Sequence, residues 1–178
     1  AYVGGLSMGG GIATRFTILN PQRVAALLIF DSFSAAGLET PPENRRMRED
    51  IIRLSETEGM SAVADYAIKN NPNIRQTAAL GEEHENRIRQ MYQALNPVGY
   101  AHITRMILDA VFDASLLEGI KVPTLVLAGQ EDGALPACRF IHDKIKDSQL
   151  VVIPGAGHLS NLDQPAEFNH AVLEYLAS

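Results

Sequence analysis

Three short apolar runs, separated by stretches with helical spacing, constrain the fold of this 178-residue chain more than any other feature. The runs are RVAALLIFDS (23–32), VPTLVLAGQED (122–132) and SQLVVIPGAGH (148–158). Apolar runs of this length that do not alternate with polar residues suit strands buried on both faces of a parallel sheet. Residues 137–145 and 165–177, which follow the last two runs, have helical spacing. This alternation predicts an α/β fold, a parallel sheet with flanking helices and right-handed crossovers.

The first twenty residues extend this pattern. The opening AYVGG is the end of an apolar stretch and suits the last residues of a strand. From Met8 to Leu19 the apolar residues follow helical spacing, and Asn20-Pro21 ends the helix.

The middle of the chain has a different character. Residues 33–115 are more polar, and no strand-like run interrupts them. Helices are predicted there over 43–59, 60–71, 82–95 and 100–112. We therefore predict a core made of residues 1–32 and 116–178, with a helical insertion at 33–115.

Composition argues against nucleic-acid and membrane partners. The net charge is −6, and the densest basic cluster, Arg45, Arg46 and Arg48, lies among acidic residues. We interpret this cluster as a solvated helix face, because a nucleic-acid footprint needs clustered Lys and Arg on one face. The longest apolar runs are too short to cross a bilayer.

Cysteine usage bears on the compartment and on metals. Cys138 is the single cysteine, so neither an intrachain disulfide nor a Cys-based metal site can form. A reducing compartment such as the cytoplasm fits this composition, and so does a secreted enzyme without disulfides. The residues at the N-terminus show no signal-peptide pattern.

The motif Gly5-Leu6-Ser7-Met8-Gly9 lies between the first predicted strand and the first predicted helix. In this context Gly-x-Ser-x-Gly predicts a sharp, strained turn that presents the serine hydroxyl above the sheet. We expect Gly5 and Gly9 to leave room where a Cβ would collide. The N–H of Met8, in the first helical turn, would then donate to an oxyanion. A phosphate-binding loop is disfavoured, because neither Gly-Lys-Ser/Thr nor Gly-x-Gly-x-x-Gly with a later acidic residue is present.

A serine nucleophile needs a histidine base. His84, His142 and His170 fall in helical patterns and are interpreted as surface or packing residues, while His102 lies in the insertion, where it would contact a substrate if it lines a pocket. His158 lies on a loop just after a predicted strand. Ligands of open α/β sheets bind at that edge, so His158 is the predicted base.

Two carboxylates compete to orient this histidine. Asp132 ends the run LVLAGQED, and Asp31 ends LLIFD, so both follow the carboxyl end of a strand. We favour Asp132. The chain order Ser7, Asp132, His158 then places all three residues at one edge of the sheet.

In these residues and motifs the chain resembles the α/β-hydrolase family, and within it the carboxylesterases and 3-oxoadipate enol-lactonases. The segments GLSMGG, VPTLVLAGQED and GAGHLSNLDQPAEFNHAVLEYL carry the resemblance. It implies a serine hydrolase of small ester or lactone substrates that needs no cofactor or metal. By family likeness Ser7 is the nucleophile, His158 the base, Asp132 the acid and Met8 the oxyanion donor, and residues 33–115 correspond to the cap.

The sequence departs from the family at its front. In the family, about the first third of the chain supplies several strands and a loop that donates the second oxyanion N–H, and this sequence has no counterpart to it. We expect an open sheet edge, filled by a separate chain, by a second copy of this chain in a homo-oligomer, or by local rearrangement. Loss of one oxyanion donor costs about 10²–10³ in rate, so if nothing replaces this loop we expect weak esterase activity on activated esters.

Two other functions fit the same residues. The first is a same-fold carbon–carbon bond hydrolase or cofactor-free perhydrolase, which keeps the three catalytic residues and changes the substrate. The second is a non-catalytic subunit that pairs through its open sheet edge.

Overall fold

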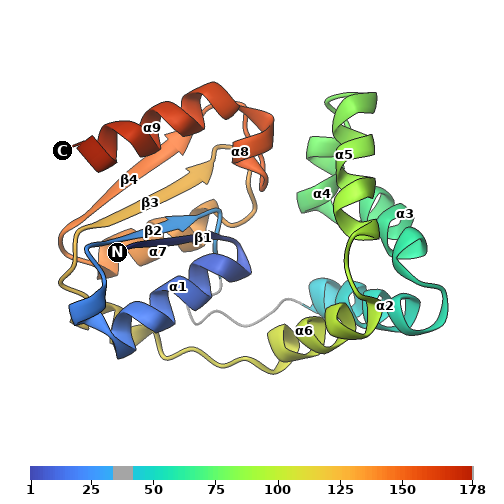
Figure 1. Ribbon diagram of the computed structural model, residues 1–178, viewed down its shortest axis with the longest axis horizontal. Coiled ribbons are helices and arrows are strands. Elements are labelled where there is room, and N and C mark those ends of the chain that lie inside the picture. The colour runs from blue at the N-terminus through green and yellow to red at the C-terminus, as the bar shows by residue number, and fades with distance from the viewer. Residues whose placement is uncertain (34–41, 178) are drawn as a thin grey trace. The chain divides into compact units, whose positions relative to one another are not determined.

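The computed structural model describes residues 1–33 and 42–177, which belong to two compact units (Figure 1). Unit 1 comprises Ala1–Leu38 and Phe112–Ser178, and unit 2 comprises Glu39–Val111. Each unit has its own set of buried apolar side chains. The predicted insertion, 33–115, extends a few residues beyond unit 2 at both ends, and its role as a cap remains a prediction.

Unit 1 is built on a four-stranded parallel sheet in the order β1-β2-β3-β4. The strands are β1 (Tyr2–Leu6), β2 (Ala26–Phe30), β3 (Thr124–Gly129) and β4 (Ser148–Ile153). The predicted parallel α/β fold is confirmed. Because the strands are parallel and in register, their carboxyl ends meet at one edge, where Leu6 pairs with Phe30 and Gly129 with Ile153.

Helices cover both faces of this sheet, which explains why β2 is apolar throughout and β3 carries no polar side chain after Thr124. On one face α1 (Met8–Leu19), the 3₁₀ helix η2 (Ala114–Gly119) and α7 (Leu135–Lys144) pack on Leu27, Ile29 and Val126. On the other face α9 (Pro165–Ala177) packs on Leu127 and Ile153. Figure 1 shows α9 above the sheet and α1 below it.

Three short elements of unit 1 were not predicted. The 3₁₀ helix η1 (Pro21–Arg23) follows α1, η2 precedes β3, and α8 (Ser160–Asp163) follows His158. All three are too short to produce a clear helical period in the sequence.

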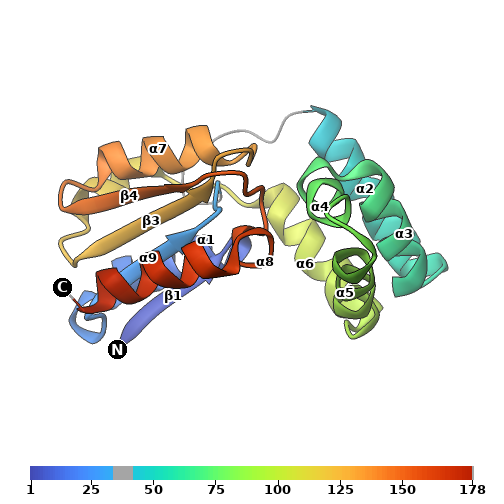
Figure 2. The same ribbon diagram turned by 90° about the horizontal axis from the view of Figure 1, so that it is seen from above.

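The described part of unit 2, residues 42–111, contains five α-helices, one more than predicted: α2 (Pro42–Thr57), α3 (Met60–Asn70), α4 (Pro72–Ala78), α5 (Glu82–Gln93) and α6 (Pro97–Asp109). Helix α3 packs against both α2 and α5 (Figure 2). The helix predicted over 60–71 ends at Asn71, and the same residue begins α4, because the Asn71 side chain accepts from the Asn73 N–H at 3.1 Å and Pro72 follows it.

One expectation about the surface of unit 2 is wrong. Arg45 and Arg46 are exposed as predicted for a solvated helix face, but Arg48 is half-buried. The Arg48 guanidinium interacts electrostatically with Tyr92 and Tyr100, and burial lowers the pKa of Arg48. The centroids of the two tyrosine rings lie 5.8 Å apart, in an edge-to-face arrangement. A long aliphatic stem lets an arginine cover apolar surface in this way.

Within residues 1–33 and 42–177, no helix is both long and apolar enough to span a bilayer.

Candidate active site

Ser7 occupies the single residue between β1 and α1. Its N–H donates to the Phe30 carbonyl at 2.8 Å, which continues the β1–β2 ladder, and α1 begins at Met8. Ser7 has φ 54° and ψ −117°, a conformation that is strained for a residue with a Cβ. The strained turn that Gly-x-Ser-x-Gly predicts is therefore present at Ser7.

Of the two glycines of the motif, Gly5 is crowded as the sequence predicted and Gly9 is not. A Cβ on Gly5 would lie 2.3 Å from the backbone carbon of Gly9, so Gly5 has to be glycine. A Cβ on Gly9 would meet no atom within 4 Å, so the expected collision at Gly9 is wrong. The second crowded glycine is Gly10, whose Cβ would lie 2.7 Å from the Ser32 Cβ. The Gly9 backbone lies close to Gly5, whereas a side chain at position 9 would point into open space.

Ser7, His158 and Asp132 form a continuous hydrogen-bonded chain. The His158 Nε2 lies 2.9 Å from the Ser7 Oγ, and its Nδ1 lies 3.0 and 3.1 Å from the two carboxylate oxygens of Asp132. The three residues come from the ends of β1, β3 and β4. The shared sheet edge thus brings together side chains up to 151 positions apart in the chain.

The surroundings of Asp132 favour one tautomer of His158. The Asp132 side chain is fully buried, and its Oδ1 also accepts from the Ala134 N–H at 2.9 Å. A carboxylate can only accept, so the Nδ1 of His158 carries the proton that faces it. The Nε2 then presents its lone pair to the Ser7 hydroxyl, the arrangement that a general base requires.

The loop that carries His158 is fastened to the loop that carries Asp132. The Glu131 N–H donates to the Ala156 carbonyl at 2.9 Å, and the Gly157 N–H donates to Asp163 Oδ2 at 2.7 Å. A Cβ on Gly129 would lie 2.2 Å from the Gly157 carbonyl oxygen. Glycine at position 129 therefore allows the histidine loop to approach the end of β3.

Asp31, the competing acid, bonds elsewhere. Its Oδ1 accepts from the Gly129 N–H at 2.8 Å, and its Oδ2 accepts from the Ser160 hydroxyl. The carboxyl is completely buried, and burial raises its pKa to about 7. Of the two carboxylates that the sequence offered, the structure puts Asp132 against His158.

Three polar residues beside the site were missed by sequence reasoning. The Ser32 Oγ donates to the Ser7 carbonyl at 2.6 Å, Ser160 bonds Asp31, and Asp163 holds the Gly157 N–H. Ser32 directly follows the candidate acid Asp31, and Ser160 follows His158 by two positions. This proximity in the sequence is the one signal that could have identified the two serines.

Cys138 lies near this network but has no nucleophilic character. Its Sγ donates to the Ser32 carbonyl at 3.4 Å, and burial raises the pKa of the thiol to about 12. A thiol with such a pKa stays protonated near neutral pH and reacts poorly.

The two other histidines of unit 1 take no part in this hydrogen-bonded chain: the His142 Nδ1 lies 2.8 Å from the Ser148 Oγ, and His170 is exposed beside Glu174. In unit 2, His102 is exposed on α6 and His84 is half-buried on α5. Over residues 1–33 and 42–177, no group of three or more His, Cys, Asp or Glu side chains is placed to hold a metal ion.

Met8, the predicted oxyanion donor, is the first residue of α1. N–H groups in the first turn of a helix have no acceptor within that helix. The Met8 N–H is thus suited to a developing oxyanion on Ser7, and its role stays a prediction.

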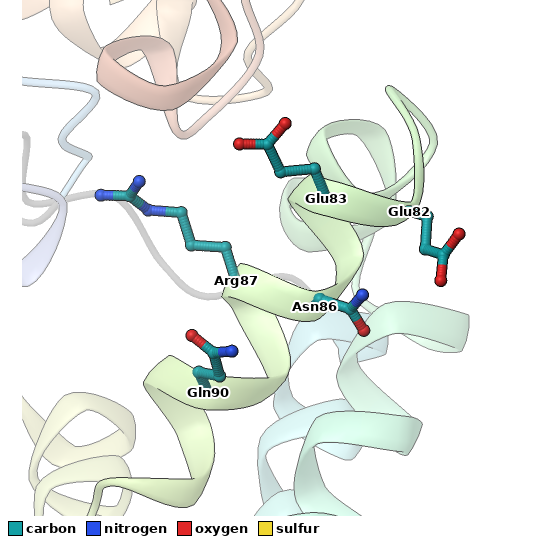
Figure 3. Close-up of a pocket in the computed structure, with 5 residues that line it drawn as sticks. All are labelled: Glu82, Glu83, Asn86, Arg87 and Gln90. Atoms are coloured by element: carbon teal, nitrogen blue, oxygen red, sulfur yellow. The ribbon is translucent and has the colours of Figure 1, made fainter.

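A shallow hollow in unit 2 runs along one side of α5 (Figure 3). Its lining consists of Glu82, Glu83, Asn86, Arg87 and Gln90. All five side chains are exposed and come from a single helix, so the hollow offers no enclosed site.

The chain belongs to the alpha/beta hydrolase family, whose model matches residues 1–171. The strand–serine–helix arrangement and the parallel sheet described above agree with that assignment.

Similar proteins of known name include hydrolases and a synthase. A Bacillus subtilis (strain 168) protein, provisionally named 2-succinyl-6-hydroxy-2,4-cyclohexadiene-1-carboxylate synthase, is 30% identical over 98% of this chain and 65% of its own length. The 3-oxoadipate enol-lactonase 2 of Acinetobacter baylyi is 27% identical over 94% of this chain and 60% of its own. A thermophilic esterase from Thermogutta terrifontis superposes with a TM-score of 0.76, at 30% identity, over 98% of this chain and 63% of its own.

The chain therefore spans 60–65% of the length of these proteins. Hydrolases, among them an esterase and an enol-lactonase, are thus among the relatives of this chain.

Proposed function

We propose that this protein is a serine hydrolase that cleaves the carboxylic ester bonds of small substrates, as an esterase or lactonase, through an acyl-enzyme. The observation that carries the proposal is the 2.9 Å hydrogen bond from the Ser7 hydroxyl to His158 Nε2, with Asp132 on the other ring nitrogen. A nucleophile, a base and a group that orients the base, each within hydrogen-bond reach, are the requirements for acyl transfer.

In the first half of the reaction, the Ser7 Oγ attacks the ester carbonyl carbon and its proton passes to His158 Nε2. The buried Asp132 carboxylate stabilises the imidazolium that forms. The carbonyl oxygen becomes an oxyanion, for which the Met8 N–H is a suitable donor. When the tetrahedral intermediate collapses, the leaving alkoxide takes the proton from His158 and departs as the alcohol, which leaves an acyl group on Ser7.

In the second half, a water molecule replaces the alcohol. One of its protons passes to His158 Nε2 while its oxygen attacks the acyl carbon, and Ser7 recovers that proton as the carboxylic acid product leaves. In a lactone the alcohol and the acid belong to one molecule, so the same steps open the ring. No group other than these side chains and water is needed to balance the reaction.

The relatives support the choice of an ester or lactone substrate. One is named as an esterase and another as an enol-lactonase, and both act on a carbonyl carbon bonded to oxygen. A small activated ester is therefore the appropriate first probe.

The test combines covalent labelling with turnover. We expect wild type to react with a fluorophosphonate probe at Ser7, located by peptide mass spectrometry, and to hydrolyse p-nitrophenyl butyrate. Ser7→Ala should abolish labelling and reduce turnover by at least about 10³-fold, because the residues of a catalytic triad act as a unit. The matched control is Ser115→Ala, an exposed serine of η2.

The histidine is tested in the same way. His158→Gln should match Ser7→Ala, whereas His170→Gln, on the exposed face of α9, should behave as wild type. Labelling that survives Ser7→Ala would contradict the proposed nucleophile. Absence of labelling in the wild type would instead favour a non-catalytic subunit.

Substrate profiling separates the remaining alternative. If labelling occurs at Ser7 but esters and lactones are inert, then turnover of vinylogous diketones indicates a carbon–carbon bond hydrolase. Peroxide-dependent acid turnover indicates a perhydrolase. Hydrolysis of esters or lactones at the highest kcat/KM supports the proposal.

A further inference from the structure

We propose that Asp31 and Ser32, at the carboxyl end of β2, are positioning residues that hold all three catalytic segments in register. This inference rests on the proposed function, because it assigns roles relative to Ser7, Asp132 and His158. β2 itself contributes no catalytic residue, although it lies between β1, which leads to Ser7, and β3, which leads to Asp132.

Asp31 joins the acid loop to the histidine loop. Its Oδ1 accepts from the N–H of Gly129, three residues before Asp132. Its Oδ2 accepts from the hydroxyl of Ser160, two residues after His158. Each oxygen of this buried carboxyl therefore accepts a hydrogen bond from one of two segments. These are the two segments that must meet for the His158–Asp132 hydrogen bond to form.

Ser32 fastens the third segment. Its hydroxyl donates to the Ser7 carbonyl at 2.6 Å, and its Cβ fills the space above Gly10, where another Cβ would lie at 2.7 Å. The same carbonyl also accepts from the Gly10 N–H at 3.0 Å. These bonds fix the orientation of the strained Ser7 peptide, and with it the direction of the hydroxyl.

The two residues are built as a rigid junction. Both are completely buried, and Asp31 has a positive φ of 45°, which turns the chain at the end of β2. The Asp31 N–H donates to the Leu127 carbonyl at 2.8 Å, and the Ser32 carbonyl accepts from the Cys138 thiol. A strained residue persists only where its surroundings over-determine it, and such residues concentrate at functional sites.

Positioning has a measurable consequence for reactivity. A displacement of about 1 Å between reacting groups can cost about 10²-fold in rate. Asp31→Ala removes both bonds and should lower the rate constant of fluorophosphonate labelling by about 10- to 100-fold. Asp31→Asn keeps an acceptor for Gly129 and a donor for the rotatable Ser160 hydroxyl, so its rate constant should stay within about threefold of wild type.

Ser32→Ala should lower the rate constant by about tenfold, because the Ser7 peptide loses one of its donors. Rate constant and amplitude are read separately. Misfolded molecules reduce the amplitude of labelling, whereas misplaced catalytic groups reduce the rate constant. Ile145→Val, in the core of unit 1, is the control for destabilisation and should keep the wild-type rate constant.

A second readout does not depend on catalysis. The proton on His158 Nδ1 can be followed by NMR in protein with ¹⁵N-labelled histidine, and its hydrogen bond to Asp132 displaces the resonance to low field. We expect this resonance in wild type and Asp31→Asn, and its loss or broadening in Asp31→Ala. If wild type is not labelled at all, the proposed function is wrong, and this resonance still decides the positioning role.

Two results would overturn the inference. One is an Asp31→Ala variant with the wild-type rate constant and the wild-type resonance. The other is an Asp31→Asn variant that falls as far as Asp31→Ala, because that outcome would assign the effect to charge and not to the two hydrogen bonds.

Discussion

Asp31 is a carboxyl group in an environment that disfavours its charge. Burial is the largest influence on it and raises its pKa to about 7, and the nearby Asp132 carboxylate acts in the same direction. The bonds from Ser160 and Gly129 and the proximity of His158 act in the opposite direction. Around neutral pH the folded protein therefore holds a proton that the unfolded chain, with an ordinary aspartate pKa near 3.9, releases.

This difference predicts how stability varies with pH. Between about pH 4 and pH 7 the folded state binds more protons than the unfolded state at this residue, so its contribution to the free energy of unfolding decreases as pH rises. The decrease is at most about 1.4 kcal/mol per pH unit, and it ends above pH 7. Asp31→Asn has no proton to lose, so its stability relative to wild type should increase from pH 4 to pH 7.

Urea unfolding followed by circular dichroism measures this difference, since the chain contains no tryptophan. The comparison with Asp31→Asn cancels the other titrating groups. Asp113→Asn, at an exposed site where the folded pKa is lowered, is the control and should not reproduce the trend. Parallel stability curves for wild type and Asp31→Asn would contradict the raised pKa.

At the scale of elements, the β1–turn–α1 segment distinguishes two glycines that look equivalent in the motif. Gly5 faces the Gly9 backbone and has no room for a Cβ, whereas Gly9 lies within α1 with open space around its Cβ position. The crowding arises because β1 and α1 approach each other closely, so it affects the residue whose Cβ position lies between the two elements.

Alanine substitutions should therefore have opposite effects at the two positions. Gly9→Ala should raise the free energy of unfolding by up to about 0.5 kcal/mol, because alanine loses less backbone entropy than glycine and Gly9 lies in the first turn of α1 and not in its interior. Gly5→Ala should lower it by about 1–3 kcal/mol or more, through overpacking against backbone that cannot move aside. Thermal and urea unfolding of both variants checks this, and equal destabilisation by the two would show that Gly9 is crowded as well.

The sequence predicted helix boundaries closely where the apolar periodicity was long, and it missed helices where the periodicity was short. Helices α1, α2 and α5 begin and end within a few residues of their predicted bounds, because their apolar periods extend over several turns. Helices α4 and α8 have seven and four residues, too few for a period to be recognised. Helix α4 depends on the local cap at Asn71, and α8 forms where the histidine loop is held by Asp163.

At the scale of the whole molecule, the edge of the sheet bears on association. Within the described residues β1 pairs with β2 alone, and Tyr2 on β1 is 61% exposed. Leu19 at the end of α1 is 63% exposed. A strand edge without a partner is a template for pairing with another chain.

We therefore expect these 178 residues, expressed as such, to self-associate. Sedimentation velocity over micromolar concentrations should show species heavier than 19.4 kDa. Tyr2→Lys should shift the distribution toward the monomer, because charge on an edge strand disfavours pairing. Leu173→Lys, an exposed apolar residue of α9, is the matched control and should leave it unchanged. A monomer at all concentrations would contradict this expectation.

The sequence by itself determined the α/β class and placed Ser7, His158 and two candidate carboxylates at one edge of the sheet. Continuous apolar runs indicate strands that are buried on both faces, and parallel strands bring the residues that follow them to one edge, so the serine, the histidine and the two aspartates could be predicted together. Only the tertiary structure decided between Asp132 and Asp31, and showed that Gly10 rather than Gly9 is crowded. These outcomes depend on distances of a few ångströms between segments that are far apart in the chain. The spacing of apolar residues in the sequence does not specify such distances.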